Sequence, residues 1–582
     1  MKATSSTSTA SADASLWAPG PAGSPWRLTG QRLGLLLVLV GLFGCQQPGE
    51  AQPHTPRPTL DSGGTLPPRQ AAYDVRHYDL ALAVDPDQRR IDGTLTLRAT
   101  IVQPISTLEL DLDSRFDVRR AGVEAAEAPF ESDEGRLRIL LPRTYQPGET
   151  VTVDVAYGGA PRVAPNPPWD GGFTWAQTNT GAPWIATSVQ GQGCDLWWPC
   201  KDHPSDEPDS LALRITVPAP LVVATNGVLH RVDEAEGQRT YHWTTQHPVN
   251  TYGVALNIAP YVALDTTYAS IDGTEMPVTF YVLPEAEAGG RRQLPQFLDH
   301  LAFYEEVLGP YPFRTEKYGV AHTPHLGMEH QTIIAYGDDF DDTPYGFDWL
   351  HHHELGHEWW GNLVTAADWR DFWIHEGFCT YMQALYTERL FGPERYRAYM
   401  ATTRTYLQNR RTVAPRTSQT TQDMYFSDTV RGVTDNDVYY KGAWILHTLR
   451  YLMGDEPFFQ ALRRFAYPAP AWEARTGGGQ TRFVSSEEFI RLAEELADQP
   501  LDWFFDLYLR QPALPLLRTE RDGDTLRLRW DTPEALPFPM PVEVQVGGEV
   551  VWVEMTGGRG TVTVPEGVTP VIDPDGWVLA ER

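Results

Sequence analysis

Apolar and polar residues alternate over much of the first half of the chain. Residues 73–84 (YDVRHYDLALAV) and 91–101 (IDGTLTLRATI) alternate strictly and contain β-branched residues, as half-buried strands do. Similar runs, punctuated by Pro and Gly, continue to about residue 262. The pattern predicts an N-terminal antiparallel β domain over residues 71–262.

From about residue 290 the apolar residues recur at helical spacing, which predicts a mostly helical domain over residues 263–512. Short alternating runs return over residues 513–582 and predict a small C-terminal β-sandwich. The chain is therefore expected to be a multidomain α+β protein. The helical runs cover residues 294–309, 347–362, 372–392, 441–454 and 485–498, the last opening like a capping box.

The first 70 residues look like an export segment. Residues 33–44 (LGLLLVLVGLFG) follow Arg27 and Arg32, and twelve apolar residues suit a signal-peptide core rather than a membrane span. The sequence ending in Cys45 resembles a bacterial lipobox, which implies a signal peptide over residues 1–44 and a lipid on Cys45. A Pro- and Gly-rich tether over residues 45–70 would follow. A plain signal peptide or a misassigned start codon are the alternatives.

These features predict an exported bacterial lipoprotein, periplasmic or at the cell surface, anchored to a membrane. Export permits a disulfide between Cys194 and Cys200, although the sequence leaves their geometry open. Cys379 lies in a predicted helix and is expected to be a buried thiol.

The strongly negative net charge of the chain limits which macromolecules it can bind. The formal net charge is −29 and the isoelectric point is about 4.9, so the surface repels phosphate backbones and nucleic acid is excluded as a partner. Only four of the 47 basic side chains are lysines, namely Lys2, Lys201, Lys317 and Lys441. A chain that otherwise uses Arg retains Lys where a compact ammonium is needed, or by chance.

One helical run carries the pattern of a metal site. His353-Glu354-Leu-Gly-His357 places two imidazoles one turn apart on one helix face, where both can bind one ion. Glu376 follows 19 residues after His357, at the start of the next helical run, and can supply a third ligand. Two His and one Glu leave a fourth position for water, as in a catalytic site for one Zn²⁺. The alternative is a solvated polar helix.

HELGHEWWGN followed by FWIHEGF resembles the metal-binding pattern of the aminopeptidase N family of zinc metallopeptidases. This family of gluzincins includes the leukotriene hydrolases, and the resemblance covers about residues 73–510. It implies a thermolysin-like catalytic domain, with His353, His357 and Glu376 as zinc ligands and Glu354 as general base.

Gly327-Met328-Glu329-His330 resembles the family's G-x-M-E-N signature. The resemblance implies that Glu329 binds the substrate's α-amine and that the backbone of Gly327 and Met328 contacts the substrate. Three positions depart from the family pattern: Leu326 for Gly, His330 for Asn and His375 for Asn. The two Asn-to-His changes put fine substrate positioning in doubt, but not the metal ligands, and both histidines are expected to be buried or to support the site from behind.

Two further segments complete the resemblance. Gln190, nine residues before the Pro of a P-C-x-D segment, matches a second amine-binding position, with Gln192 as a close rival. Tyr439, in Y-x-K-G, matches the tyrosine that donates to the developing oxyanion, with Tyr440 as the alternative.

The sequence therefore predicts a zinc-dependent aminopeptidase that acts on peptides with a free N-terminus. An epoxide hydrolase of the leukotriene type, a non-catalytic peptide-binding module and a surface adhesin are the alternatives.

Overall fold

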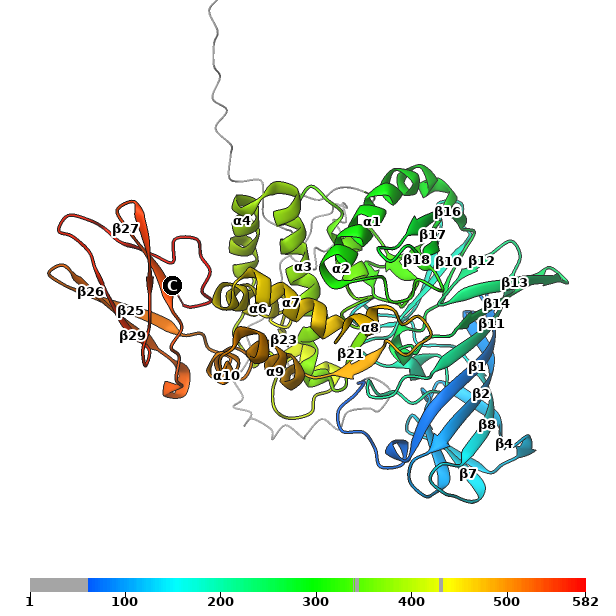
Figure 1. Cartoon of the computed structure of the whole chain (residues 1–582). Helices are drawn as coiled ribbons and strands as arrows, with labels where there is room; N and C mark the ends of the chain where they lie inside the picture. The colour runs from blue at the N-terminus through cyan, green and yellow to red at the C-terminus, as the bar shows by residue number, and fades with distance from the viewer. Residues whose placement is uncertain (1–60, 339, 341–344, 429–432, 582) are drawn as a thin grey trace, which may run out of the picture.

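The computed structural model describes residues 61–338, 340, 345–428 and 433–581, which form three successive parts (Figure 1). The predicted signal peptide and Cys45 lie outside these residues. Among the residues that the structure places, no helix combines the length and apolar character that a membrane crossing needs. The parts are an N-terminal β domain, a helical domain and C-terminal strands, so the predicted fold class is confirmed; the residue boundaries at 262 and 512 stay predictions.

A strongly twisted eight-stranded sheet dominates the N-terminal domain. Its pairs are antiparallel except β1 and β11, which run parallel, with His77 opposite Ser210. The prediction of purely antiparallel pairing is wrong at this pair, because the long connection between the two strands returns the chain in the same direction. In sheet order the strands are β13 (Val228–Ala235), β14 (Gln238–Thr245), β11 (Ser210–Pro218), β1 (Tyr73–Asp85), β2 (Arg90–Ile101), β8 (Thr150–Gly159), β4 (Phe116–Val123) and β5 (Ala126–Glu127).

Two smaller sheets complete this domain, and a disulfide joins Cys194 to Cys200 beside them. The four-stranded sheet leads directly to the segment that contains Gln190. Its order is β12 (Val222–Ala224), β15 (Asn257–Ala259), β10 (Pro183–Ser188) and β9 (Gly172–Gln177), and the three-stranded sheet is β3 (Ile105–Asp111), β7 (Arg136–Tyr145) and β6 (Phe130–Asp133).

The next part combines a five-stranded sheet with the helices. The sheet order is β16 (Val262–Ala269), β17 (Glu275–Val282), β18 (Tyr318–His322), β20 (Ile334–Tyr336) and β19 (Gly327–Met328), so β19 is an edge strand. Short strands pair elsewhere in this part, β21 (Val364–Ala366) with β24 (Arg482–Val484) and β22 (Phe426–Asp428) with β23 (Val433–Thr434). The helices are α1 (Glu287–Leu308), α2 (Trp349–Gly356), α3 (Trp373–Phe391), α4 (Pro393–Arg404), α5 (Thr421–Tyr425), α6 (Tyr440–Met453), α7 (Asp455–Ala466), α8 (Pro470–Glu473), α9 (Ser486–Ala497) and α10 (Asp502–Tyr508).

The capping box expected at the start of α9 does not form. The Ser485 side chain makes no capping hydrogen bond. Glu488, its expected partner, pairs with Arg482 instead. An ion pair between two residues that are six apart in the sequence therefore takes the place of the expected capping hydrogen bonds.

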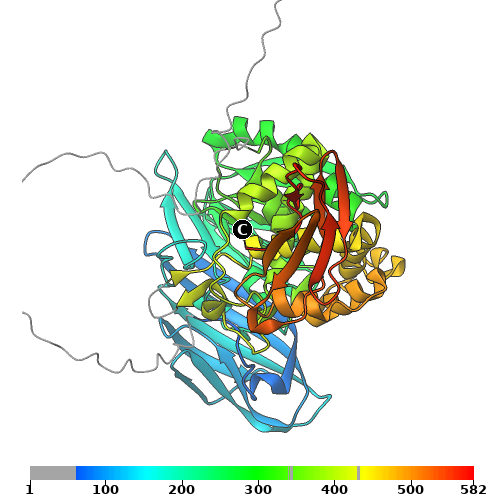
Figure 2. The same ribbon diagram turned by 90° about the vertical axis from the view of Figure 1, so that its left-hand side faces the viewer.

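The C-terminal strands form two three-stranded sheets, as the predicted β-sandwich requires. In the perpendicular view these red strands lie in front of the helices (Figure 2). Their buried residues join the hydrophobic core of the helical domain, whereas most of the N-terminal domain has a core of its own. The sheets are β25 (Leu516–Asp522), β26 (Thr525–Asp531) and β29 (Arg559–Thr563), and β28 (Glu549–Val553), β27 (Val542–Val546) and β30 (Val571–Ile572).

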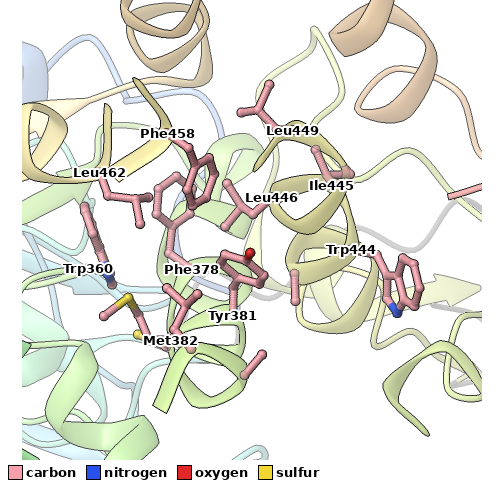
Figure 3. Packing of buried hydrophobic residues seen from close by; sticks show 14 of the residues in the cluster. Trp360, Phe378, Tyr381, Met382, Trp444, Ile445, Leu446, Leu449, Phe458 and Leu462 are labelled. Carbon is pink, nitrogen blue, oxygen red and sulfur yellow. The ribbon is translucent and has the colours of Figure 1, made fainter. Parts of the chain in front are cut away.

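The core of the helical domain fixes how the helices cross. Phe378 and Met382 on α3 pack with Leu446 on α6 and with Phe458 and Leu462 on α7 (Figure 3). Cys379 is buried in the same cluster as a free thiol, as expected. Burying these side chains holds α3 rigidly, and α3 carries Glu376.

Every lysine in the described chain is buried and bound to backbone carbonyls. Lys201, Lys317 and Lys441 are each at most 5% exposed. A compact ammonium with three donors suits this task better than the planar guanidinium of Arg. The acceptors are the carbonyls of Tyr73 for Lys201, of Thr225 and Gly227 for Lys317, and of Gln511 and Pro512 for Lys441.

Lys201 also forms a buried ion pair with Asp206, with 2.6 Å between Nζ and Oδ2. We expect Lys201→Met to lower the free energy of unfolding by about 3–5 kcal/mol, because it leaves a carboxylate buried without its counter-charge. The double variant Lys201→Met/Asp206→Asn should show a smaller decrease in the free energy of unfolding, because it leaves no unpaired buried charge. Urea unfolding of the three proteins checks this, and equal losses in the single and double variants would contradict it.

Candidate active site

Helix α2 presents the first two metal-binding side chains. Asp348 caps its N-terminus, accepting a hydrogen bond from the amide of His351 at 2.9 Å. His353 and Glu354 follow within the helix and His357 lies at its C-cap. One turn separates the two histidines, so both imidazoles leave the helix on one side.

Helix α3 supplies the third side chain, and the three atoms form a nearly equilateral triangle. Nε2 of His353 lies 3.1 Å from Oε2 of Glu376, Nε2 of His357 lies 3.5 Å from it, and the two nitrogens are 3.3 Å apart. Ligands on a tetrahedral Zn²⁺ at 2.0–2.1 Å are separated by about 3.3 Å. The triangle therefore has the size that one zinc ion requires.

The ligand orientation is also fixed. Nδ1 of His357 donates to the carbonyl of Trp360 at 2.9 Å, which leaves the lone pair of Nε2 for a metal. His353, His357 and Glu376 are each at most 9% exposed. Two imidazole nitrogens that face each other in a buried site are best stabilised by a cation between them.

Glu354 lies beside the triad and packs against the edge strand β19, where no side chain would fit at the position of Gly327. Carboxylate or imidazole atoms of Glu329, Glu354 and His357 all lie within 4.8 Å of one another. A Cβ on Gly327 would be 2.1 Å from Oε1 of Glu354, so β19 can approach this closely only as glycine. Burial raises the pKa of Glu354 well above its ordinary range.

Glu329 belongs to a hydrogen-bonded chain that passes through Gln190 of the N-terminal domain and ends at Tyr425 of α5. Nε2 of Gln190 donates to Oε1 of Glu329, and the hydroxyl of Tyr425 donates to Oε1 of Gln190 at 2.6 Å. The rival Gln192 instead accepts from the amide of Gly171 at 2.7 Å. Tyr425 was not predicted, because nothing in its local sequence signals that α5 reaches the cavity.

Tyr439 reaches the triad because two helices touch through their backbones. A Cβ on Gly377 of α3 would lie 2.9 Å from the Cα of Gly442 on α6. The Tyr439 ring consequently stacks 6.2 Å from the His353 ring. Burial raises the pKa of Tyr439 well above its usual range, so its hydroxyl stays protonated and can donate.

These side chains line one cavity of about 460 Å³. The backbone of Gly327 and Met328 forms part of its wall, and both Tyr439 and Tyr440 face it. His330 and His375 are absent from its lining and fully buried. Nε2 of His375 accepts a hydrogen bond from the amide of Ala366 at 2.9 Å. His330 and His375 therefore lie behind the cavity wall, whereas Leu326, the third departure from the family pattern, lines the cavity.

The HExxH helix and the returning glutamate define the class of the protein as a zinc metallopeptidase. Comparison with known proteins gives the family. The "Peptidase M1 N-terminal domain" matches residues 75–252 and the "Peptidase family M1 domain" matches residues 349–474, together just over half of the chain. The chain belongs to peptidase family M1, and its predicted cofactor, one zinc ion, is confirmed.

Three named relatives are 23–27% identical to this chain over the residues that align. Endoplasmic reticulum aminopeptidase 1 of Homo sapiens is 27% identical over 60% of this chain, which spans 39% of that protein. The leucyl aminopeptidase of Saccharolobus solfataricus is 23% identical over 66% of this chain, which spans 49% of it. Leucine aminopeptidase 2 of Sclerotinia sclerotiorum is 23% identical over 82% of this chain and 80% of its own length.

Solved structures agree with this assignment. An M1 zinc metallopeptidase mutant from Deinococcus radiodurans, bound to a Tyr-Ser-Ala substrate, aligns with a TM-score of 0.62 and 26% identity. The alignment covers 76% of this chain and 95% of that one. A non-mutant form of the same metallopeptidase aligns with a TM-score of 0.61 and 25% identity, covering 76% of this chain and 95% of that one.

The geometry of the triad predicts a specific pattern of zinc loss. His357→Ala and Glu376→Ala should keep almost no zinc after dialysis, whereas Glu354→Gln should keep about one ion per chain because Glu354 is not part of the triangle. Metal content by plasma mass spectrometry checks this. Zinc lost equally from Glu354→Gln would mean that Glu354 is itself a ligand.

Proposed function

We propose that this protein is a zinc-dependent aminopeptidase that hydrolyses the first peptide bond of substrates with a free N-terminus. The observation that carries the proposal is the buried Glu329–Gln190 pair beside the metal triad. A carboxylate in that position binds a free ammonium more tightly than the neutral amide of an internal residue. This preference confines cleavage to the first peptide bond.

Different residues of the cavity would bind the zinc ion and the substrate. His353, His357 and Glu376 would hold the zinc, which when bound polarises the scissile carbonyl and lowers the pKa of a water. Glu329 and Gln190 bind the α-ammonium, and the edge strand β19 would meet the substrate backbone at Gly327 and Met328, which line the cavity.

Glu354 moves the proton in this proposal. Its carboxylate accepts a proton from the attacking water and then delivers it to the leaving amine. Tyr439, kept protonated by burial, donates a hydrogen bond to the developing oxyanion, worth a few kcal/mol in the transition state. Glu354→Gln should therefore lose nearly all turnover while keeping its zinc.

The amine-binding role of Glu329 has its own test. Glu329→Ala should reduce kcat/KM for free-amine aminoacyl arylamides by at least about tenfold, since a charge-assisted hydrogen bond contributes about 1.5–3 kcal/mol. Cleavage of the N-acetylated analogues, which lack an ammonium, should barely change. The ratio of the two rates is the measurement, and an unchanged ratio would remove Glu329 from the amine site.

We further propose that the mature protein is a lipoprotein attached to a membrane through Cys45. The apolar run at residues 33–44 and the lipobox-like sequence support this proposal. Cys45→Ser should move the protein from the membrane pellet to the soluble fraction at unchanged specific activity, because the acyl chains supply the membrane affinity. Retention in the pellet would argue against the anchor.

A further inference from the structure

The cavity has a second end that the proposed mechanism does not use. Tyr345, Tyr399, Tyr406 and Tyr440, with Thr380 and Gln383 of α3, line it; we name these six residues the tyrosine chamber. Its rings pack in pairs, with centroids 5.1 Å apart for Tyr345 and Tyr399 and 4.9 Å apart for Tyr406 and Tyr440. These paired rings form the walls of the chamber.

The direction of the helices places this chamber opposite the amine-binding end. Helices α2 and α3 run antiparallel, since His353 meets Glu376 while Nε2 of Gln383 donates to the carbonyl of Trp349 at 2.9 Å. Thr380 and Gln383 therefore lie about 6 and 10 Å beyond Glu376 along α3. Glu329 lies near His357, at the other end of α2.

The chamber is aromatic and carries no formal charge. The aromatic rings offer faces to a flat or bulky apolar group. Burial raises the pKa of Tyr399 well above its usual range, so this phenol stays neutral. A charged group entering the chamber would lose its hydration without gaining a counter-ion.

We propose that the tyrosine chamber binds the side chain of the substrate's second residue and selects aromatic or bulky aliphatic side chains there. The proposal rests on the proposed aminopeptidase function. An extended peptide advances about 3.3–3.6 Å per residue, so a chain whose ammonium is at Glu329 and whose first carbonyl is at the triad continues toward Thr380.

A peptide series tests the proposal. Leu-X-amides with X as Gly, Phe, Asp or Lys keep the first residue constant and remove the terminal carboxylate. With the zinc-loaded enzyme, kcat/KM for Leu-Phe-amide should exceed that for Leu-Gly-amide by at least about tenfold and exceed those for the Asp and Lys peptides by more. Equal rates for Phe and Gly would overturn the chamber's role and leave the aminopeptidase function standing.

Two neighbouring threonines of α4 provide the matched variants. Thr403 lines the cavity beside the chamber, one helical turn after Tyr399, whereas Thr402 does not line it. Thr403→Leu should fill the chamber and reduce the Phe-to-Gly ratio at least about fivefold, while Thr402→Leu should keep it. Tyr399→Leu, which removes a ring, should also reduce the ratio if Thr403→Leu fails to fold. A ratio unchanged in every chamber variant overturns the proposal, and failure to release Leu from any peptide overturns the aminopeptidase function together with it.

Discussion

Negative charge buried in one cavity is the constraint on which this site depends. Glu329, Glu354 and Glu376 are each at most 7% exposed, and all three lie close to His357. Burial raises the pKa of Glu329 to about 7, so this carboxyl is not held ionised by its surroundings alone. In the proposed mechanism, a divalent cation at the triad and a substrate ammonium at Glu329 would supply the missing positive charge. A cation at the triad would then favour the ionised form of Glu329, which is the form that binds the ammonium.

Close backbone approach is what brings these groups together. Gly377 and Gly442 let α3 and α6 touch, and Gly327 lets β19 reach Glu354. In each case the glycine stands beside a residue of the site: Glu376 precedes Gly377, Tyr439 lies three residues before Gly442, and Glu329 lies two after Gly327. A side chain at any of these glycines would displace the neighbouring site residue without removing it. Misplacement by about 1 Å can lower the reaction rate about 10²-fold.

The parts predicted from sequence are those that local spacing determines. The period of α3 and the alternation of β1 identified both elements, and the HExxH spacing with a later Glu identified the triad, because one helical turn fixes the distance between its histidines. Tyr425, the tyrosine chamber and the parallel β1–β11 pair were not predicted. Each depends on segments far apart in the chain. At Ser485, by contrast, the neighbouring Arg482–Glu488 ion pair outweighs the hydrogen bonds that the capping-box motif predicts.

His330 and His375, which stand where the family usually has asparagine, do not contact the cavity directly. His330 and His375 are both fully buried and outside the cavity lining. Because Nε2 of His375 accepts from the amide of Ala366, the ring holds β21 rather than a substrate. The two histidines therefore do not contact a substrate in the cavity; they lie next to the backbone behind the cavity wall. The side chains that touch a peptide in the proposed mechanism are unaffected, and any effect of the histidines on the reaction has to act through the placement of Glu329 and Glu376, their immediate neighbours in the chain.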